Sequence, residues 1–253
     1  MRFYGNASVA RKADESPVTA ADHAANDVLL DALRRTFPLD AILSEESNDS
    51  RDRLGAERVW IVDPLDGTKE FLARNGEFSI MTGLAVDGEA VLGVVYLPDE
   101  DRLYGAARGL GAWVERGGRT RRVECSASAR PLRLVGSRSH AEPLLARMQE
   151  ALGIDDVLPC GSVGVKCARI VEGARDLYIH PVPYLKEWDT CAPEVLVREA
   201  GGWVSDCRGD PLSYNKRDPR QPHGFLACVP TGARRVVDVV RALYDDHSRS
   251  APA

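Results

Sequence analysis

The chain has 253 residues, of which 44% are hydrophobic and 28% charged, and its 33 basic and 38 acidic side chains give a formal net charge of −5. This composition excludes a mainly disordered chain, because it supplies enough apolar material for a sizeable core. The acidic balance disfavours nonspecific nucleic-acid binding, which needs a basic footprint. No apolar run is long enough to cross a bilayer, and the N-terminus lacks the apolar stretch of a signal peptide.

Six cysteines are scattered along the chain without the paired spacing of a zinc site. In a chain of this length, such cysteines are typical of reduced core thiols in a reducing compartment. We therefore expect a cytoplasmic protein.

The first half of the chain predicts a helix followed by a series of strands. Thr19 and Asp22 have the spacing of a capping box, and apolar residues at helical spacing follow them, so we expect a helix over residues 20–36. Apolar runs separated by glycine-containing turns then predict strands at 41–43, 59–62, 78–86, 90–96, 103–107 and 111–114.

The second half of the chain alternates between strand and helix patterns. Strands are predicted at 132–135, 177–180, 203–206 and 225–229. Helices are predicted at 142–152, 163–172, 191–199 and 233–244. Antiparallel strands first and alternating elements later indicate two sub-domains that divide near residue 130.

The most informative segment is DPLDGT at residues 63–68, where a predicted buried strand ends in two carboxylates. Along a regular strand Asp63 and Asp66 would point to opposite faces, but the proline and glycine can fold the chain tightly. Such a turn can bring both carboxylates and the carbonyl of Leu65 to one point, and converging hard oxygen donors suit magnesium. Thr68 adds a hydroxyl beside that point.

Two other segments carry acidic residues at the ends of predicted elements. Glu45 follows a short strand, and Asp189 stands where a helix is expected to start. Carboxylates gathered from separated segments are the usual way in which a two-metal phosphate site is made. Taken singly, each has an ordinary alternative, because an aspartate in a turn is commonly a cap and a glutamate pair is commonly on the surface.

Together these motifs resemble the inositol monophosphatase superfamily of magnesium-dependent, lithium-sensitive phosphatases. The resemblance is carried, in chain order, by residues 14–22, 44–46, 63–71, 187–194 and 201–202. Lys-Glu-Phe at 69–71 and Ser-Arg-Ser-His at 137–140 most resemble the CysQ-type 3′(2′),5′-bisphosphate nucleotidases, since inositol phosphatases usually carry Thr-Asn-Phe at the first of these places. The resemblance implies a layered αβαβα fold of mixed α and β class.

The resemblance also implies an activity, the hydrolysis of 3′-phosphoadenosine 5′-phosphate to AMP and phosphate by a metal-activated water. Asp22 and Thr68 match the pair that positions and deprotonates this water. Two or three magnesium ions would be held by Glu45, Asp63, the Leu65 carbonyl, Asp66 and Asp189, with Asp63 as a bridge. The substrate would be contacted by Glu45, Leu65, Asp66, Gly67, Thr68, Ser137, His140, Ser162, Lys166 and Asp189.

These assignments divide the chain by role. Residues 1–130 are expected to form an N-terminal α+β sub-domain with most metal ligands, and residues 131–253 a C-terminal α/β sub-domain with Asp189 and the nucleotide contacts. The expected partner is a small phosphate ester, foremost an adenosine bisphosphate, and not a nucleic acid. We expect a monomer or a homodimer with at most peripheral contact to a membrane.

Three alternatives remain open on the sequence. A phosphatase for inositol monophosphate or a sugar phosphate would use the same scaffold. A phosphatase of the haloacid-dehalogenase type would need its acids two positions apart, whereas Asp63 and Asp66 are three apart. A sensor would keep the site without turnover. The family's usual first helix has no counterpart before residue 12, so either the start of the chain is truncated or misassigned, or the sub-domain lacks this helix. Without the helix, apolar surface is expected to be exposed at Val28, Leu29 and Leu33.

Overall fold

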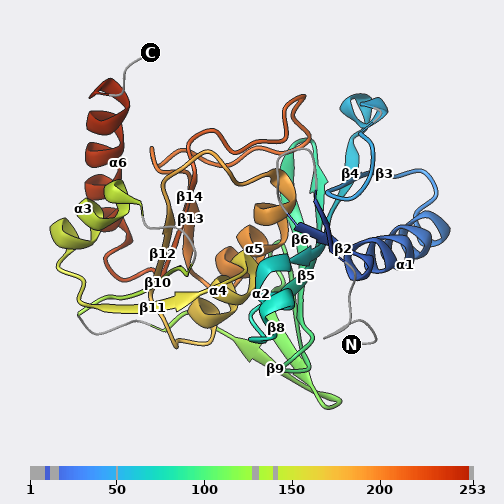
Figure 1. Cartoon of the computed structure of the whole chain (residues 1–253), viewed down its shortest axis with the longest axis horizontal. Coiled ribbons are helices and arrows are strands. Elements are labelled where there is room, and N and C mark those ends of the chain that lie inside the picture. The colour runs from blue at the N-terminus through green and yellow to red at the C-terminus, as the bar shows by residue number, and fades with distance from the viewer. Residues whose placement is uncertain (1–8, 12–16, 50, 127–130, 139–141, 251–253) are drawn as a thin grey trace.

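The computed structural model stacks helices and sheets in five layers (Figure 1). Helix α1 (Ala20–Thr36) covers the outer face of a seven-stranded sheet. Helices α4 (Val163–Val171) and α5 (Glu187–Glu199) fill the middle layer. A five-stranded sheet follows, and α3 (Pro143–Leu152) and α6 (Ala233–Ser250) cover its other face. This arrangement confirms the predicted αβαβα fold. The structure describes residues 9–11, 17–49, 51–126, 131–138 and 142–250.

The larger sheet runs in the order β3-β4-β5-β6-β7-β8-β9. Its first two strands pair in parallel and all later neighbours pair antiparallel. From β5 to β9 short turns join successive strands, which is compatible only with antiparallel pairing. The strands are β3 (Ala41–Ser44), β4 (Arg58–Asp66), β5 (Ser79–Val86), β6 (Glu89–Leu97), β7 (Arg102–Ala107), β8 (Gly111–Arg116) and β9 (Arg119–Val123).

The smaller sheet has the order β11-β10-β12-β14-β13, with β10 parallel to both of its neighbours. Its strands are β10 (Arg133–Ser137), β11 (Asp156–Cys160), β12 (Leu177–His180), β13 (Trp203–Ser205) and β14 (Phe225–Cys228). Four short elements complete the described chain. They are the paired strands β1 (Val9–Arg11) and β2 (Pro17–Thr19), the helix α2 (Thr68–Ala73) and one turn of 3₁₀ helix at Asp52–Gly55.

One apolar core joins the two sheets through the middle helices. Tyr104 from the larger sheet, Phe225 from the smaller sheet and Leu196 from α5 are all fully buried in it. Helix α5 lies close on the larger sheet because Gly93 has no side chain: a Cβ there would stand 2.4 Å from the carbonyl oxygen of Ala192. The sheets divide the chain near residue 130, yet they share this core, so the division into two sub-domains stays a prediction.

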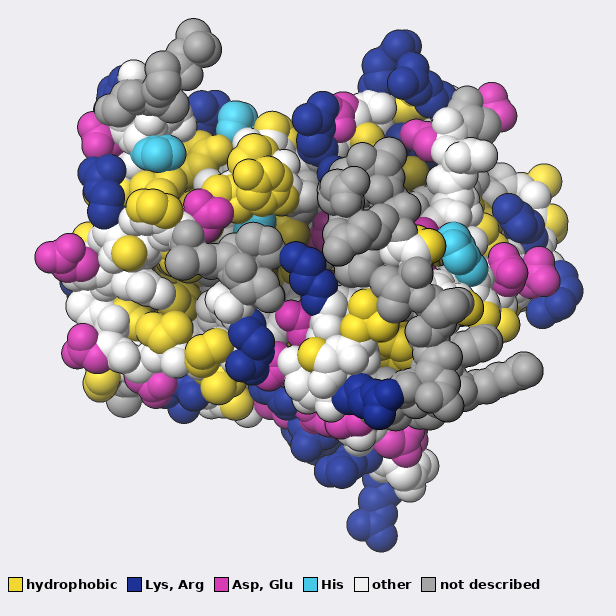
Figure 2. Space-filling model, in the orientation of Figure 1, with side chains coloured by type: hydrophobic (Ala, Val, Ile, Leu, Met, Phe, Trp, Pro, Cys, Tyr) yellow, Lys and Arg dark blue, Asp and Glu magenta, His cyan; other side chains and the backbone are white. Residues whose placement is uncertain are grey.

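Five short elements, β1, β2, α2, β9 and β11, were not predicted, and one helix begins earlier than predicted. Strand β9 gave no alternating signal, because its residues Arg119 to Arg122 are all exposed at the edge of the sheet. Basic side chains gather at the tip of the β8–β9 hairpin (Figure 2). Strand β11 was not predicted because it contains a proline, a residue that is rare inside strands. Helix α5 begins at Glu187 rather than at 191, so that Asp189 lies in its first turn.

The apolar face of α1 is turned toward the sheet. Leu30 and Leu33 are buried against Trp60, and Leu29 packs partly on the same cluster. The expectation that Leu29 and Leu33 form an exposed apolar surface is therefore wrong, and only Val28, at 69% exposure, fits it. Among the described residues, no helix combines the length and the apolar character needed to cross a bilayer.

All six cysteines are free thiols, as predicted, and five of them are buried. Burial raises the pKa of Cys228 to about 12 and that of Cys160 to about 11. Thiols with such raised pKa values carry almost no thiolate near neutral pH, so these cysteines serve packing rather than chemistry.

Candidate active site

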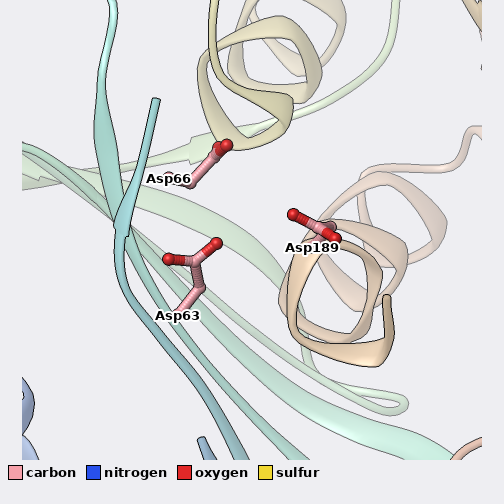
Figure 3. A group of neighbouring side chains, drawn as sticks. All are labelled: Asp63, Asp66 and Asp189. Atoms are coloured by element: carbon pink, nitrogen blue, oxygen red, sulfur yellow. The ribbon is translucent and has the colours of Figure 1, made fainter. Parts of the chain in front are cut away.

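Three carboxylates from two distant segments meet between the larger sheet and the middle helices. Asp63 and Asp66 lie in the last part of β4, and Asp189 lies in the first turn of α5. One carboxylate oxygen of each lies within 4.8 Å of the others, and the three side chains turn toward a common space (Figure 3). Asp63 is 1% exposed and Asp66 is 8% exposed, while Asp189 is half-buried, so the cluster is largely shielded from solvent.

A bulge in β4 explains why both aspartates of DPLDGT reach the cluster. Asp63 pairs with Met81 and Asp66 pairs with Ser79, so the register shifts between them. The shift breaks the alternation that would send the two side chains to opposite faces of the sheet. The backbone N–H of Leu65 donates a 3.0 Å hydrogen bond to Oδ1 of Asp63, which holds the turn in place. Gly67 follows at a φ of +97°, a conformation that favours glycine.

The cluster is electrostatically unfavourable without a cation. Burial is the largest cause that raises the pKa of Asp63 well above its ordinary range, and the negative charges of Glu45, Asp66 and Asp189 raise it further. Burial, Glu45 and Asp66 likewise raise the pKa of Asp189. The backbone N–H of Lys186 opposes this effect through a 2.6 Å hydrogen bond to Asp189. Converging, buried carboxylate oxygens of this kind fit a hard divalent cation, whose charge would offset their repulsion.

Glu45 stands beside the three aspartates. It directly follows β3, which pairs in parallel with β4, and its backbone N–H donates to the carbonyl of Val62 at 3.1 Å. A hydrogen bond between Glu45 and Asp63 is among the causes that raise the pKa of Asp63. The structure thus brings together Glu45, Asp63, Asp66 and Asp189, while their roles as metal ligands stay a prediction.

The carbonyl of Leu65, the fifth predicted ligand, faces the side chain of Thr68. The Thr68 hydroxyl lies 3.4 Å from this carbonyl oxygen and donates to Oδ1 of Asp22 at 3.1 Å. Asp22 is 1% exposed, and its other oxygen accepts from the backbone N–H and the hydroxyl of Thr19, at 2.8 and 2.6 Å. The predicted capping box is therefore present, and it fixes Asp22 next to Thr68.

Asp66 has a set of hydrogen-bond partners that sequence reasoning did not assign to it. Its Oδ2 accepts from the hydroxyls of Ser79 and Ser162, at 3.1 and 2.5 Å, and from the backbone N–H of Gly164 at 2.9 Å. Ser79 was missed altogether, because nothing in its sequence neighbourhood distinguishes it from other strand serines. The N-terminus of α4 thus orients one oxygen of Asp66.

The predicted nucleotide contacts lie around the N-terminus of α4 and the end of β10. Ser162 caps α4 at a φ of +55° and is 6% exposed. Lys166 is 5% exposed, with its Nζ 5.0 Å from the centre of the Tyr178 ring, so it is not a solvated surface lysine. Ser137 ends β10, opposite Cys160 in the parallel register with β11. His140 lies outside the described residues. Substrate contact by these residues stays a prediction.

Comparison with known proteins decides the family. Residues 3–229 match the model of the inositol monophosphatase family. The chain belongs to that family. It is 42% identical over 222 residues to the 3′(2′),5′-bisphosphate nucleotidase CysQ of Escherichia coli strain K12, across 87% of this chain and 89% of that protein. It is 37% identical over 235 residues to the 3′-phosphoadenosine 5′-phosphate phosphatase of Mycobacterium leprae, across 89% of this chain and 82% of that protein.

A solved structure gives the same result for the fold. The crystal structure of CysQ from Bacteroides thetaiotaomicron, a bacterial member of the inositol monophosphatase family, superposes with a TM-score of 0.74 at 34% identity. The match covers 86% of each chain. The family is metal-dependent, which agrees with the acidic cluster of Asp63, Asp66 and Asp189.

Proposed function

We propose that this protein is a magnesium-dependent, lithium-sensitive phosphatase that hydrolyses 3′-phosphoadenosine 5′-phosphate to AMP and phosphate. The observation that carries the proposal is the group of Asp63 and Asp66, both buried, with the half-buried Asp189, in a chain 42% identical to the E. coli nucleotidase CysQ. The hydrogen-bonded Thr68–Asp22 pair supports it, because hydrolysis of a phosphate ester needs an oriented water as well as charge neutralisation.

The residues proposed to hold magnesium are Glu45, Asp63, Asp66 and Asp189, together with the carbonyl of Leu65. Bound divalent ions would neutralise charge on the phosphoryl oxygens and lower the pKa of a water molecule. All five donors are oxygens. Magnesium prefers oxygen ligands, whereas several transition metals prefer nitrogen or sulfur ligands. We propose two or three ions for this set, with Asp63 shared between two of them.

Thr68 and Asp22 are proposed to orient the attacking water. The Thr68 hydroxyl donates a hydrogen bond to Asp22, so the lone pairs of its oxygen remain to accept a hydrogen bond from a water molecule. Thr68 itself is far too weak an acid to lose its proton, and it therefore passes polarisation to the Asp22 carboxylate. Helix α2 begins at Thr68, so its first backbone N–H groups can face the phosphate.

The nucleotide is proposed to lie against Ser137, His140, Ser162 and Lys166, at the junction between the two proposed sub-domains, 1–130 and 131–253. The reaction needs no nucleic acid and no membrane. Because all six cysteines are free thiols, we propose that the protein works in the cytoplasm. We propose that it is a monomer or a homodimer.

The direct test is phosphate release from three substrates side by side: 3′-phosphoadenosine 5′-phosphate, inositol 1-phosphate and fructose 1,6-bisphosphate. Each is assayed with and without magnesium, and with added lithium. We expect selective turnover of the adenosine bisphosphate that requires magnesium and is inhibited by lithium. Preferential turnover of inositol 1-phosphate would overturn the nucleotide assignment. An unchanged rate in the Asp189→Asn variant would overturn the assigned site.

A further inference from the structure

The long connection between β13 and β14, residues 206–224, links the two segments that carry Glu45 and Asp189. From the five-stranded sheet it crosses toward the loop that follows β3 (Figure 1). At the far end of this crossing, Asn215 contacts Arg53, eight positions after Glu45. The next residue, Lys216, contacts Glu187, two positions before Asp189.

The contact between Asn215 and Arg53 uses both ends of the Asn215 amide. Its Oδ1 accepts from Nη1 of Arg53 at 2.9 Å, and its Nδ2 donates to the backbone carbonyls of Arg53 and Ala56 at 2.9 and 3.3 Å. Arg53 is 3% exposed and forms two further hydrogen bonds to the carboxylate of Asp49, at 3.0 and 2.7 Å. A buried, multiply bonded arginine of this kind has one defined position.

The contact with α5 is made by Glu187, its first residue, which is fully buried. Its two carboxylate oxygens accept from the backbone N–H groups of Asn215 and Lys216, at 2.7 and 2.9 Å. Lys216 then donates to the side chain of Gln221 at 2.8 Å, and Gln221 donates to Thr190 at 3.0 Å. The first turn of α5 is thereby hydrogen-bonded to this connection on both sides of Asp189, at Glu187 and at Thr190.

We propose that Arg53, Asn215 and Glu187 form a clamp that sets the position of Glu45 relative to Asp189, with Asn215 as its central positioning residue. The inference rests on the proposed function, since it takes Glu45 and Asp189 as metal ligands. Metal affinity depends on ligands that are held in place before binding, and loss of a supporting hydrogen bond typically weakens it about 10–100-fold. Asn215 contacts the two ligand segments through Arg53 and Glu187, so its effect on the ligands would pass through these two residues.

The backbone of Asn215 makes the clamp testable without disturbing the fold. Asn215 has a φ of +59°, a left-handed conformation that glycine adopts freely. The Asn215→Gly substitution therefore removes the amide and leaves the backbone N–H bond to Glu187. A second variant, Arg53→Lys, keeps the charge but cannot form the forked contacts. Neither variant changes the net charge, so a change in metal affinity cannot come from long-range electrostatics.

The experiment is calorimetric titration of the metal-free full-length chain with magnesium alone, for the wild type, both variants and a control. The control is Asp87→Gly, which also puts glycine at an exposed left-handed turn position, with a φ of +51°, between β5 and β6. It removes one exposed negative charge, so an affinity equal to that of the wild type also shows that one surface charge has no effect on magnesium binding. We expect Asn215→Gly to raise the dissociation constant about tenfold or more, and Arg53→Lys to raise it as well. The magnesium concentration for half-maximal activity should rise in parallel, while kcat at saturating magnesium stays close to that of the wild type.

An unchanged magnesium affinity in a folded Asn215→Gly variant would overturn the clamp and leave Asn215 a purely structural role. Should that variant not fold, Arg53→Lys decides the same question. Failure of the proposed function has a different signature. A wild type that binds magnesium but releases no phosphate from the nucleotide contradicts that function alone, and a weaker magnesium affinity of Asn215→Gly would still support the clamp.

Discussion

The hydroxyl of Thr68 donates a 3.1 Å hydrogen bond to Oδ1 of Asp22, a residue 46 positions earlier in the chain. Oδ2 of Asp22 is used differently, because it accepts from the backbone N–H and the hydroxyl of Thr19 at the start of α1. Helix capping and water activation are therefore compatible roles for Asp22, with one oxygen for each. The capping box holds the Asp22 side chain rigidly where Thr68 needs an acceptor.

This relationship predicts how substitutions of Thr68 affect the rate. Thr68→Val has nearly the same shape but loses the hydroxyl, so we expect kcat to fall about 100-fold or more. Thr68→Ser keeps the hydroxyl and should retain most of the activity. Steady-state kinetics on the nucleotide substrate measure both variants. Equal activity of the valine and serine variants would show that the hydroxyl takes no part in the reaction.

Ser162 offers a test between two roles. Its hydroxyl bonds Oδ2 of Asp66 at 2.5 Å, yet the family resemblance predicts that it contacts the nucleotide. If orientation of Asp66 is its main role, Ser162→Ala raises the magnesium concentration for half-maximal activity about tenfold and leaves the KM for nucleotide unchanged at saturating magnesium. If nucleotide contact is its main role, KM rises and the magnesium requirement does not. Assays across both concentrations separate the two roles.

The charge of the acidic cluster predicts an unusual stability effect. Asp63→Asn removes a buried negative charge, and its Oδ1 can still accept from the N–H of Leu65. We expect the metal-free variant to be more stable than the metal-free wild type, by about 1–3 kcal/mol, because an uncompensated buried charge is lost. Magnesium should raise the Tm of the wild type and have little effect on the variant. Thermal unfolding with and without magnesium tests this, and a less stable metal-free variant would contradict it.

The raised pKa values of Asp63 and Asp189 predict how this stability depends on pH. Because both groups bind protons more tightly in the folded protein, their contribution to the free energy of unfolding is fully present below the ordinary carboxyl pKa of 3.8. It is lost as the pH rises through their raised folded pKa. The Tm increase caused by saturating magnesium should therefore be larger at pH 8 than at pH 5. An increase that is equal at both pH values would show that the carboxylates are already charged in the metal-free protein.

The sequence predicted most of the longer helices and strands and the main acidic residues because their signals are local, whereas the five-layer arrangement was implied by the family resemblance. The capping box at Thr19 and Asp22, the strand that ends at Asp63 and the helix near Asp189 each lie within a few residues. The family resemblance then supplied the pairing of Thr68 with Asp22, which the structure places at hydrogen-bond distance. Periodicity alone would have sent Asp63 and Asp66 to opposite faces.

The contacts that support the site could not be predicted, because the two residues of each contact are distant in the chain. Ser162 is 96 positions from Asp66, and Asn215 is 162 positions from Arg53. No periodicity or motif links such pairs. Strand β9 was not predicted for a different reason. Its side chains from Arg119 to Arg122 are exposed on both faces at the sheet edge, so its sequence shows no alternation of polar and apolar residues. The burial of Lys166 depends on Tyr178, which lies on a neighbouring strand.

Crystallography with manganese in place of magnesium shows whether Asp63, Asp66 and Asp189 hold divalent cations. Both ions accept octahedral sets of oxygen ligands, and manganese can be located by its anomalous scattering. We expect an anomalous peak in the space that these three carboxylates share, at about 2.0–2.3 Å from their oxygens. No peak at that position in crystals soaked at saturating manganese, or peaks only elsewhere on the surface, would contradict this expectation.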